Sequence, residues 1–184
     1  MRAFKIMLPL FLVLGMVSGT ACWALHFVLQ YFGLSGKQWI IDYYPAVVLG
    51  FFVHAAGAHA IGMKYAQRIP DLVILVIASV LGWRLAIEVG YDLGGPMPFV
   101  NAGALGALVL ALGSMLAWRI RARAFRFLVI ITAAGTLGGL VFHYLDAWFI
   151  SNMHDDDLWM LILFAEWQSI FMAGVAVALH AARK

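Results

Sequence analysis

The sequence contains six runs of mostly apolar residues, separated by short polar or Gly/Pro-rich breaks. The runs cover approximately residues 6–32, 44–63, 72–91, 99–118, 127–150 and 158–181. A transmembrane helix needs about 20 apolar residues to cross a hydrocarbon core about 30 Å thick, and each run meets that length. We therefore expect an all-α, polytopic membrane protein. Residues 1–184 form a single integral membrane domain, a bundle of six transmembrane helices with no soluble domain.

Composition supports this expectation. Hydrophobic residues make up 65% of the chain and charged residues only 11%, and the mean hydropathy is +0.95. A soluble fold of this size would have too few polar residues to cover its surface. The composition excludes a cytosolic enzyme, a DNA-binding module and a disordered scaffold. The single Cys22 excludes an internal disulfide and a CxxC redox motif.

Basic residues predict the orientation, because Lys and Arg in short loops stay on the cytoplasmic side. Of the twelve basic residues, ten lie in the alternate segments that include both chain ends, Lys37 lies on the other face and Arg84 lies inside a span. We expect both termini in the cytoplasm and a bacterial inner (plasma) membrane location. The arginines of residues 119–126 then anchor a helix end at anionic lipid heads, and no nucleic-acid partner is implied.

Ionisable groups inside a membrane are costly unless they are paired or hydrated, so those within the runs are candidate functional residues. Counting about 1.5 Å of rise per residue places most of them in one layer in the outer half of the bundle. We expect this layer to form an outward-facing, buried polar cavity. Its predicted ionisable core is His143, Asp146 and Glu166, its charge is set by Arg84 and Glu88, and its entrance is lined by His26, Asn101 and Asp42.

Small residues recur at three- and four-residue spacing within several runs, as Gly15 and Gly19 do in the first run. Such stripes predict close helix packing, because small side chains let helix backbones approach each other. We expect this packing at the inner end of the bundle. The aromatic residues are interpreted as interfacial belts or as lipid-facing and core filler.

The favoured hypothesis for function is that the chain binds or translocates a small solute or ion at the polar cavity, like a transporter. Carboxylates and histidines in the layer would hold a cation or relay protons, and Arg84 would receive an anionic group. No catalytic residue is assigned, and an enzyme is not favoured. The partners expected are the lipid bilayer and the small solute or ion.

Three alternatives remain open. A redox subunit would bind haem, a metal or a quinone; its haem ligands would be His54 or His59 with His26 or His143, at poorly matched depths. An intramembrane metal-dependent hydrolase would draw its ligands from His26, His143, Asp146 and Glu166, although an HExxH motif is absent. A non-catalytic subunit or assembly factor would dock on other membrane subunits. No cofactor is assigned.

Overall fold

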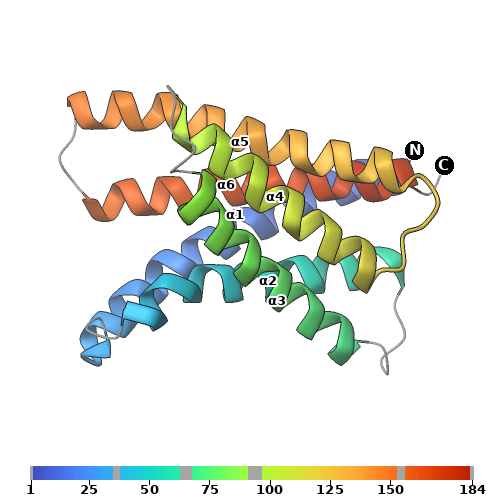
Figure 1. The fold of residues 1–184 in the computed structure, drawn as a ribbon, viewed down its shortest axis with the longest axis horizontal. Helices are drawn as coiled ribbons and strands as arrows, with labels where there is room; N and C mark the ends of the chain where they lie inside the picture. The colour runs from blue at the N-terminus through green and yellow to red at the C-terminus, as the bar shows by residue number, and fades with distance from the viewer. Residues whose placement is uncertain (1, 35–37, 63–67, 91–96, 153–155, 183–184) are drawn as a thin grey trace.

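The structure is a computed structural model that describes residues 2–34, 38–62, 68–90, 97–152 and 156–182. These ranges contain only helices and short turns. The helices are α1 (Arg2–Tyr31), α2 (Gln38–Ile61), α3 (Arg68–Leu85) with its π-helical continuation η3 (Ala86–Gly90), α4 (Pro98–Ala117), α5 (Ala124–Asn152) and α6 (Asp156–Ala182). Each expected run corresponds to one of these helices (Figure 1).

Local sequence explains several helix ends. Pro98 occupies the first turn of α4, where its missing N–H is not needed for an intrahelical bond. Gly33 and Gly62 follow the last residues of α1 and α2 with φ of 67° and 65°, a left-handed conformation that costs glycine little. The predicted all-helical class is therefore confirmed for the described residues.

The outer surface of the bundle is apolar. Large hydrophobic side chains in the middle of the helices are about half exposed, among them Met16 (56%), Ile77 (54%) and Leu137 (51%). Six helices are long and apolar enough to cross a membrane. Exposed apolar surface on every side is unfavourable in water and favourable in lipid. The fold thus indicates an integral membrane protein.

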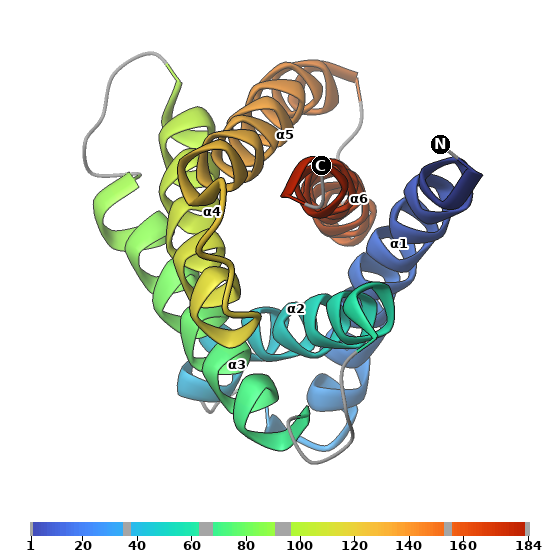
Figure 2. The same cartoon turned by 90° about the vertical axis from the view of Figure 1, so that its right-hand side faces the viewer.

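The helices form a ring in which each helix packs against the next in the sequence and α6 packs back against α1. The view along the bundle shows this ring directly (Figure 2). Within the described ranges, α2 and α6 also make a small contact across the ring. Helix α1 starts and α6 ends at the same end of the bundle (Figure 1). Here we call this end the terminal end, and the opposite end the distal end.

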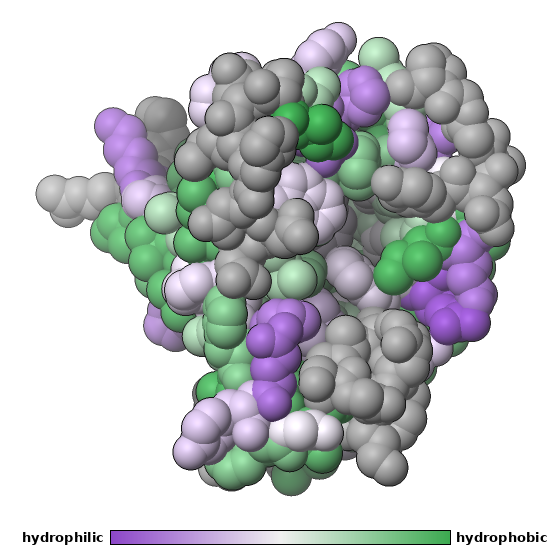
Figure 3. Space-filling model, turned by 90° about the vertical axis from the view of Figure 1, so that its left-hand side faces the viewer, coloured by the Kyte–Doolittle hydropathy of each residue, from purple (hydrophilic) through white to green (hydrophobic). Residues whose placement is uncertain are grey.

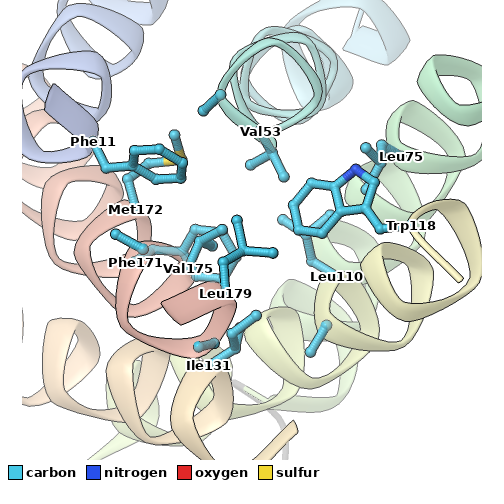
Figure 4. Packing of buried hydrophobic residues seen from close by; sticks show 14 of the residues in the cluster. Phe11, Val53, Leu75, Leu110, Trp118, Ile131, Phe171, Met172, Val175 and Leu179 are labelled. Atoms are coloured by element: carbon cyan, nitrogen blue, oxygen red, sulfur yellow. The ribbon is translucent and has the colours of Figure 1, made fainter. Parts of the chain in front are cut away.

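The terminal half of the ring is filled by a hydrophobic core. Side chains from all six helices point into its centre (Figure 4). Phe11, Phe171 and Val175 are completely buried there, and Trp118 closes the core beside Phe127. This half therefore leaves little room for a ligand.

Glycines bring α1 and α6 into close contact. A Cβ atom built on Gly15 would lie 2.5 Å from the Cα atom of Ser169, and one on Gly19 would lie 2.5 Å from the Cα atom of Ala165. Both distances are too short for a real side chain, so the small-residue stripe predicted in the first run is a helix-packing face.

Candidate functional site

The distal half of the ring contains a cavity of about 280 Å³. Its lining comes from the middle of α2 and α5, the second half of α3 together with η3, the first two thirds of α4 and the first half of α6. The cavity is partly open, and the distal surface is hollowed near its centre (Figure 3). Its volume is close to the lower end of the range of small-molecule sites, about 300–1,000 Å³.

Six aromatic side chains contribute to the cavity wall. They are Trp83, Phe99, Phe142, Trp159, Phe164 and Trp167. Neighbouring rings contact each other edge to face or tilted, with centroid distances of 4.8 Å for Phe99 and Phe142, 5.4 Å for Phe142 and Trp159, and 6.0 Å for Trp83 and Phe164. Such contacts fix ring orientations and add about 0.5–1.5 kcal/mol per pair beyond burial. The wall is therefore ordered as well as apolar.

Glycines line the side of the cavity formed by α4 and α5. They are Gly103, Gly106 and Gly139. Gly103 and Gly139 also bring the two helices together, since a Cβ atom on Gly103 would lie 3.3 Å from the Cα atom of Gly139. These two glycines therefore allow close packing of α4 against α5 beside the cavity.

The π-helix η3 forms part of the lining through Ala86 and Ile87. Gly82 and Gly90 pack on α4, where a Cβ atom on Gly90 would lie 2.6 Å from the Cα atom of Ala102. In a regular α-helix, Gly90 would be rotated away from the side of the helix on which Gly82 faces α4. The wider π turn changes this rotation and places Gly90 on the side that faces α4. Short π segments of this kind are frequent at functional sites.

The lining contains two polar groups with no hydrogen-bond partner among the described residues. They are the hydroxyl of Ser79 and the indole N–H of Trp83, and both atoms are buried. A third lining group, the indole N–H of Trp159, donates to Oδ1 of Asp146 over 2.7 Å. Because both donor atoms are fully buried, the surface of the cavity is almost entirely apolar.

Seven of the eight residues predicted to form or line a polar cavity have described side chains, and none of the seven lines this one. The described lining is apolar, although this cavity lies in the half of the bundle where the polar layer was expected. The seven residues lie around the cavity or on the outside of the ring.

Arg84 and Glu88 lie on the outer surface of α3 and η3, and their side chains are 48% and 47% exposed. They form an ion pair with each other, and Nη1 of Arg84 donates to the hydroxyl of Tyr43 over 2.9 Å. The guanidinium also lies 5.9 Å from the centre of the Tyr43 ring. This pair neutralises itself and attaches the distal end of α3 to α2.

Two predicted residues of α5 contact the wall from behind. Asp146 accepts the hydrogen bond from Trp159, and the His143 ring lies 6.4 Å from the ring of Phe99. Asn101 is half-buried near the start of α4, and its side chain is not without a partner. Asp146 and His143 therefore help to position the wall and do not face the cavity.

His26 lies on α1, which contributes nothing to the lining, and its Nε2 is 2.7 Å from Nε2 of Gln30. Its ring lies 6.4 Å from the Tyr44 ring. The side chain of Asp42 lies outside the described residues, so its predicted role at the entrance stays a prediction.

Both carboxyl oxygens of Glu166 are buried, and neither has a hydrogen bond to a described residue. Its neighbours in α6 show which way it faces. Ala165 contacts α1 at Gly19, and Trp167 contacts α5 at Gly138. Since successive residues of a helix are about 100° apart, Glu166 lies between these two contacts, and it is not part of the cavity lining.

Metal and haem sites are not supported by the described part of the chain. No group of three His, Cys, Asp or Glu residues there lies close enough to hold a metal ion. The proposed zinc ligands His26, His143, Asp146 and Glu166 are thus not brought together. No histidine lines the cavity, so it offers no axial haem ligand.

The residues that do form the cavity were interpreted from the sequence as belt or filler aromatics. Glycines at positions 103, 106 and 139 and tryptophans at positions 83, 159 and 167 all belong to the lining, but their spacing in the sequence does not show that they meet. Comparison with protein-family models, with curated proteins and with solved structures finds no match for the chain.

Proposed function

We propose that this chain is a membrane protein that binds a small, mostly apolar solute in the ring cavity. The observation that supports the proposal is a cavity of about 280 Å³ with an ordered aromatic wall in the distal half, opposite a packed terminal half. Apolar cavities of this kind stay dry and take apolar molecules. We also propose that this solute passes between the cavity and one face of the membrane.

Binding of naphthalene to the purified protein in lipid nanodiscs tests the proposal. Equilibrium dialysis against protein-free nanodiscs corrects for partition into lipid. We expect saturable binding of one molecule per chain. Ala46 is 1% exposed and lines the cavity, so Ala46→Phe fills the site and abolishes saturable binding.

The matched control is Ala55→Phe, the same change on the exposed side of the same helix α2. It should bind naphthalene as the parent protein does. Absence of saturable binding in the parent, or equal binding by the two variants, would contradict a ligand site in the cavity.

A second candidate function is favoured by Glu166. A carboxyl group inside a membrane without a protein partner must carry a proton or meet a cation. We therefore also propose that Glu166 takes part in proton or cation binding. Proton flux into proteoliposomes should fall in Glu166→Gln and stay unchanged in the control Gln30→Glu. Equal flux in the parent and Glu166→Gln would exclude this role.

The orientation proposed for the chain places both termini in the cytoplasm of a plasma membrane, with the cavity at the outer side. Support comes from the distribution of basic residues, because ten of twelve lie in segments at the terminal end. A role as a subunit of a larger membrane complex fits the same topology, and the bound solute would then be shared with a partner subunit.

A further inference from the structure

We propose that the cavity opens between α2 and η3, and that the hydrogen bond from Arg84 to Tyr43 is a latch across this opening that controls how fast a solute enters and leaves. This inference rests on the proposed function, because it concerns the regulation of the same site. Three observations on the described residues support it: the exposure of one lining residue, the divergence of two helices, and a side-chain bridge that joins them.

Ile87 marks the position of the opening. The described lining consists of buried and half-buried residues and one exposed residue, Ile87, which is 48% exposed. A residue that lines a cavity and is also exposed on the outside lies where the cavity meets the surface. Ile87 belongs to η3, one turn after Arg84 and directly before Glu88. The mouth of the cavity is therefore beside the ion pair of these two residues.

Helices α2 and α3 separate at this point because they cross. At the crossing they are in close contact, since a Cβ atom on Gly50 would lie 2.9 Å from the Cα atom of Val76. Toward the distal end the two helices diverge (Figure 1), and η3 packs on α3 and α4 with at most slight contact to α2 among the described residues. Ala46 of α2 and Trp83 of α3 lie beyond the crossing, and both line the cavity. The cavity thus lies behind the space between the diverging helices.

The Arg84 side chain spans this space. Its Nη1 donates to the hydroxyl of Tyr43 over 2.9 Å, and its guanidinium lies 5.9 Å from the centre of the Tyr43 ring. Tyr43 precedes Gly50 by two turns of α2, so both residues are on the face toward α3. Counting about 1.5 Å of rise per residue, the bridge is about 10 Å from the crossing along α2. The mouth is therefore bounded by the crossing on one side and by Arg84 and Tyr43 on the other.

The strength of this bridge suits a latch. Glu88 holds Arg84 at the rim of the mouth through their ion pair, and both side chains are about half exposed. Exposed bridges of this kind are weak, because solvent competes for the same groups. Loss of one hydrogen bond changes an opening equilibrium about three- to tenfold. The bridge is thus strong enough to slow exchange of the solute and weak enough to let it pass.

Fluorine NMR of fluoronaphthalene in nanodiscs tests the latch, because it measures both the dissociation constant and the rates of exchange between the lipid and the cavity. Tyr43→Phe removes only the hydroxyl group that accepts the hydrogen bond from Arg84. We expect the association and dissociation rate constants to rise together by about three- to tenfold, because the mouth is open for a larger fraction of the time. The dissociation constant should stay nearly unchanged, since the cavity wall is intact.

A second variant removes the other partner of the bridge. Arg84→Met keeps a long side chain but has no donor, and it should speed exchange at least as much as Tyr43→Phe. The matched control is Tyr144→Phe, which removes the hydroxyl of a tyrosine that is 62% exposed on α5 and is not part of the lining. Its rate constants should equal those of the parent.

The outcomes separate the latch from the proposed function. Saturable binding with equal exchange rates in the parent, Tyr43→Phe and Arg84→Met would overturn the latch and leave the proposed function intact. Faster exchange in Tyr144→Phe as well would also overturn the latch, because the effect would then not depend on the mouth. Absence of saturable binding to the parent would overturn the proposed function and the latch with it.

Discussion

At the scale of single residues, the structure divides the polar groups of the spans into paired and unpaired ones. Arg84 has both Glu88 and Tyr43 as partners, and Asp146 has Trp159. Glu166 has no partner among the described residues. The sequence could place these groups at one depth by counting residues. It could not show which pairs form, since pairing depends on the rotation of each helix about its axis.

Glu166 should therefore lower the stability of the folded protein. We expect Glu166→Leu to raise the free energy of unfolding in mild detergent by about 1–3 kcal/mol, because an unpaired buried polar group is replaced by an apolar one. Glu88→Leu serves as the control and should not stabilise, since it deprives Arg84 of its ion-pair partner. A lower unfolding temperature for Glu166→Leu would show that the carboxyl group has a partner in the native protein.

Asp71 and Arg119 give a second residue-scale prediction. Asp71 is 1% exposed in the first turn of α3, and its Oδ2 lies 3.4 Å from Nη1 of Arg119, whose side chain is 59% exposed. Arg119→Ala leaves the buried carboxylate unpaired. We expect a loss of about 1–2 kcal/mol, less than for a fully buried pair because solvent screens the arginine. Arg121→Ala, at an exposed position in the same loop, should change the unfolding temperature little, and equal effects of the two changes would contradict a stabilising bridge.

At the scale of helices, glycine faces decide which helices meet. The α1–α6 contact depends on Gly15 and Gly19, and the α4–α5 contact depends on Gly103 and Gly139. The spacing of Gly15 and Gly19 predicted a packing face on α1. It could not predict that Gly103 and Gly139 would pack beside a cavity, because this requires knowing which residues of other helices lie next to them.

Substitution of Gly19 tests the α1–α6 contact. Gly19→Leu places side-chain atoms against the backbone of Ala165, so the helices must separate. We expect a loss of at least about 3 kcal/mol in the free energy of unfolding, the upper part of the overpacking range. Gly106→Ala is the control, because its Cβ atom would make an ordinary contact of 3.5 Å with Ala86. A Gly19→Leu protein as stable as the Gly106→Ala protein would mean that the close contact is absent.

At the scale of the whole molecule, the structure is a ring with one packed half and one hollow half. Apolar run lengths were enough to predict six helices, since every run must fill the hydrocarbon thickness. They could not predict the order of helices around the ring or the apolar lining of the cavity. The sequence favoured polar side chains that face the cavity. Arg84 and Glu88 instead lie on the outer surface, where their ion pair and their exposure offset the cost of their charges.

The proposed orientation is tested by labelling from outside the cell. The native Cys22 is fully buried and should stay unlabelled. A cysteine at Phe32, which is 68% exposed just after α1, should react with a membrane-impermeant maleimide in intact cells. A cysteine at Arg121 should react only after the membrane is opened. Labelling of Arg121→Cys in intact cells, with Phe32→Cys protected, would show the opposite orientation.

The central claim is that the hollow half of the ring holds a ligand. Native mass spectrometry of the protein released from the membrane in which it was made tests this claim most directly. We expect one small adduct of defined mass per chain in the parent and in Ala55→Phe, and no adduct in Ala46→Phe, whose cavity is filled. An adduct of the same mass and occupancy in Ala46→Phe, or none in the parent, would contradict it.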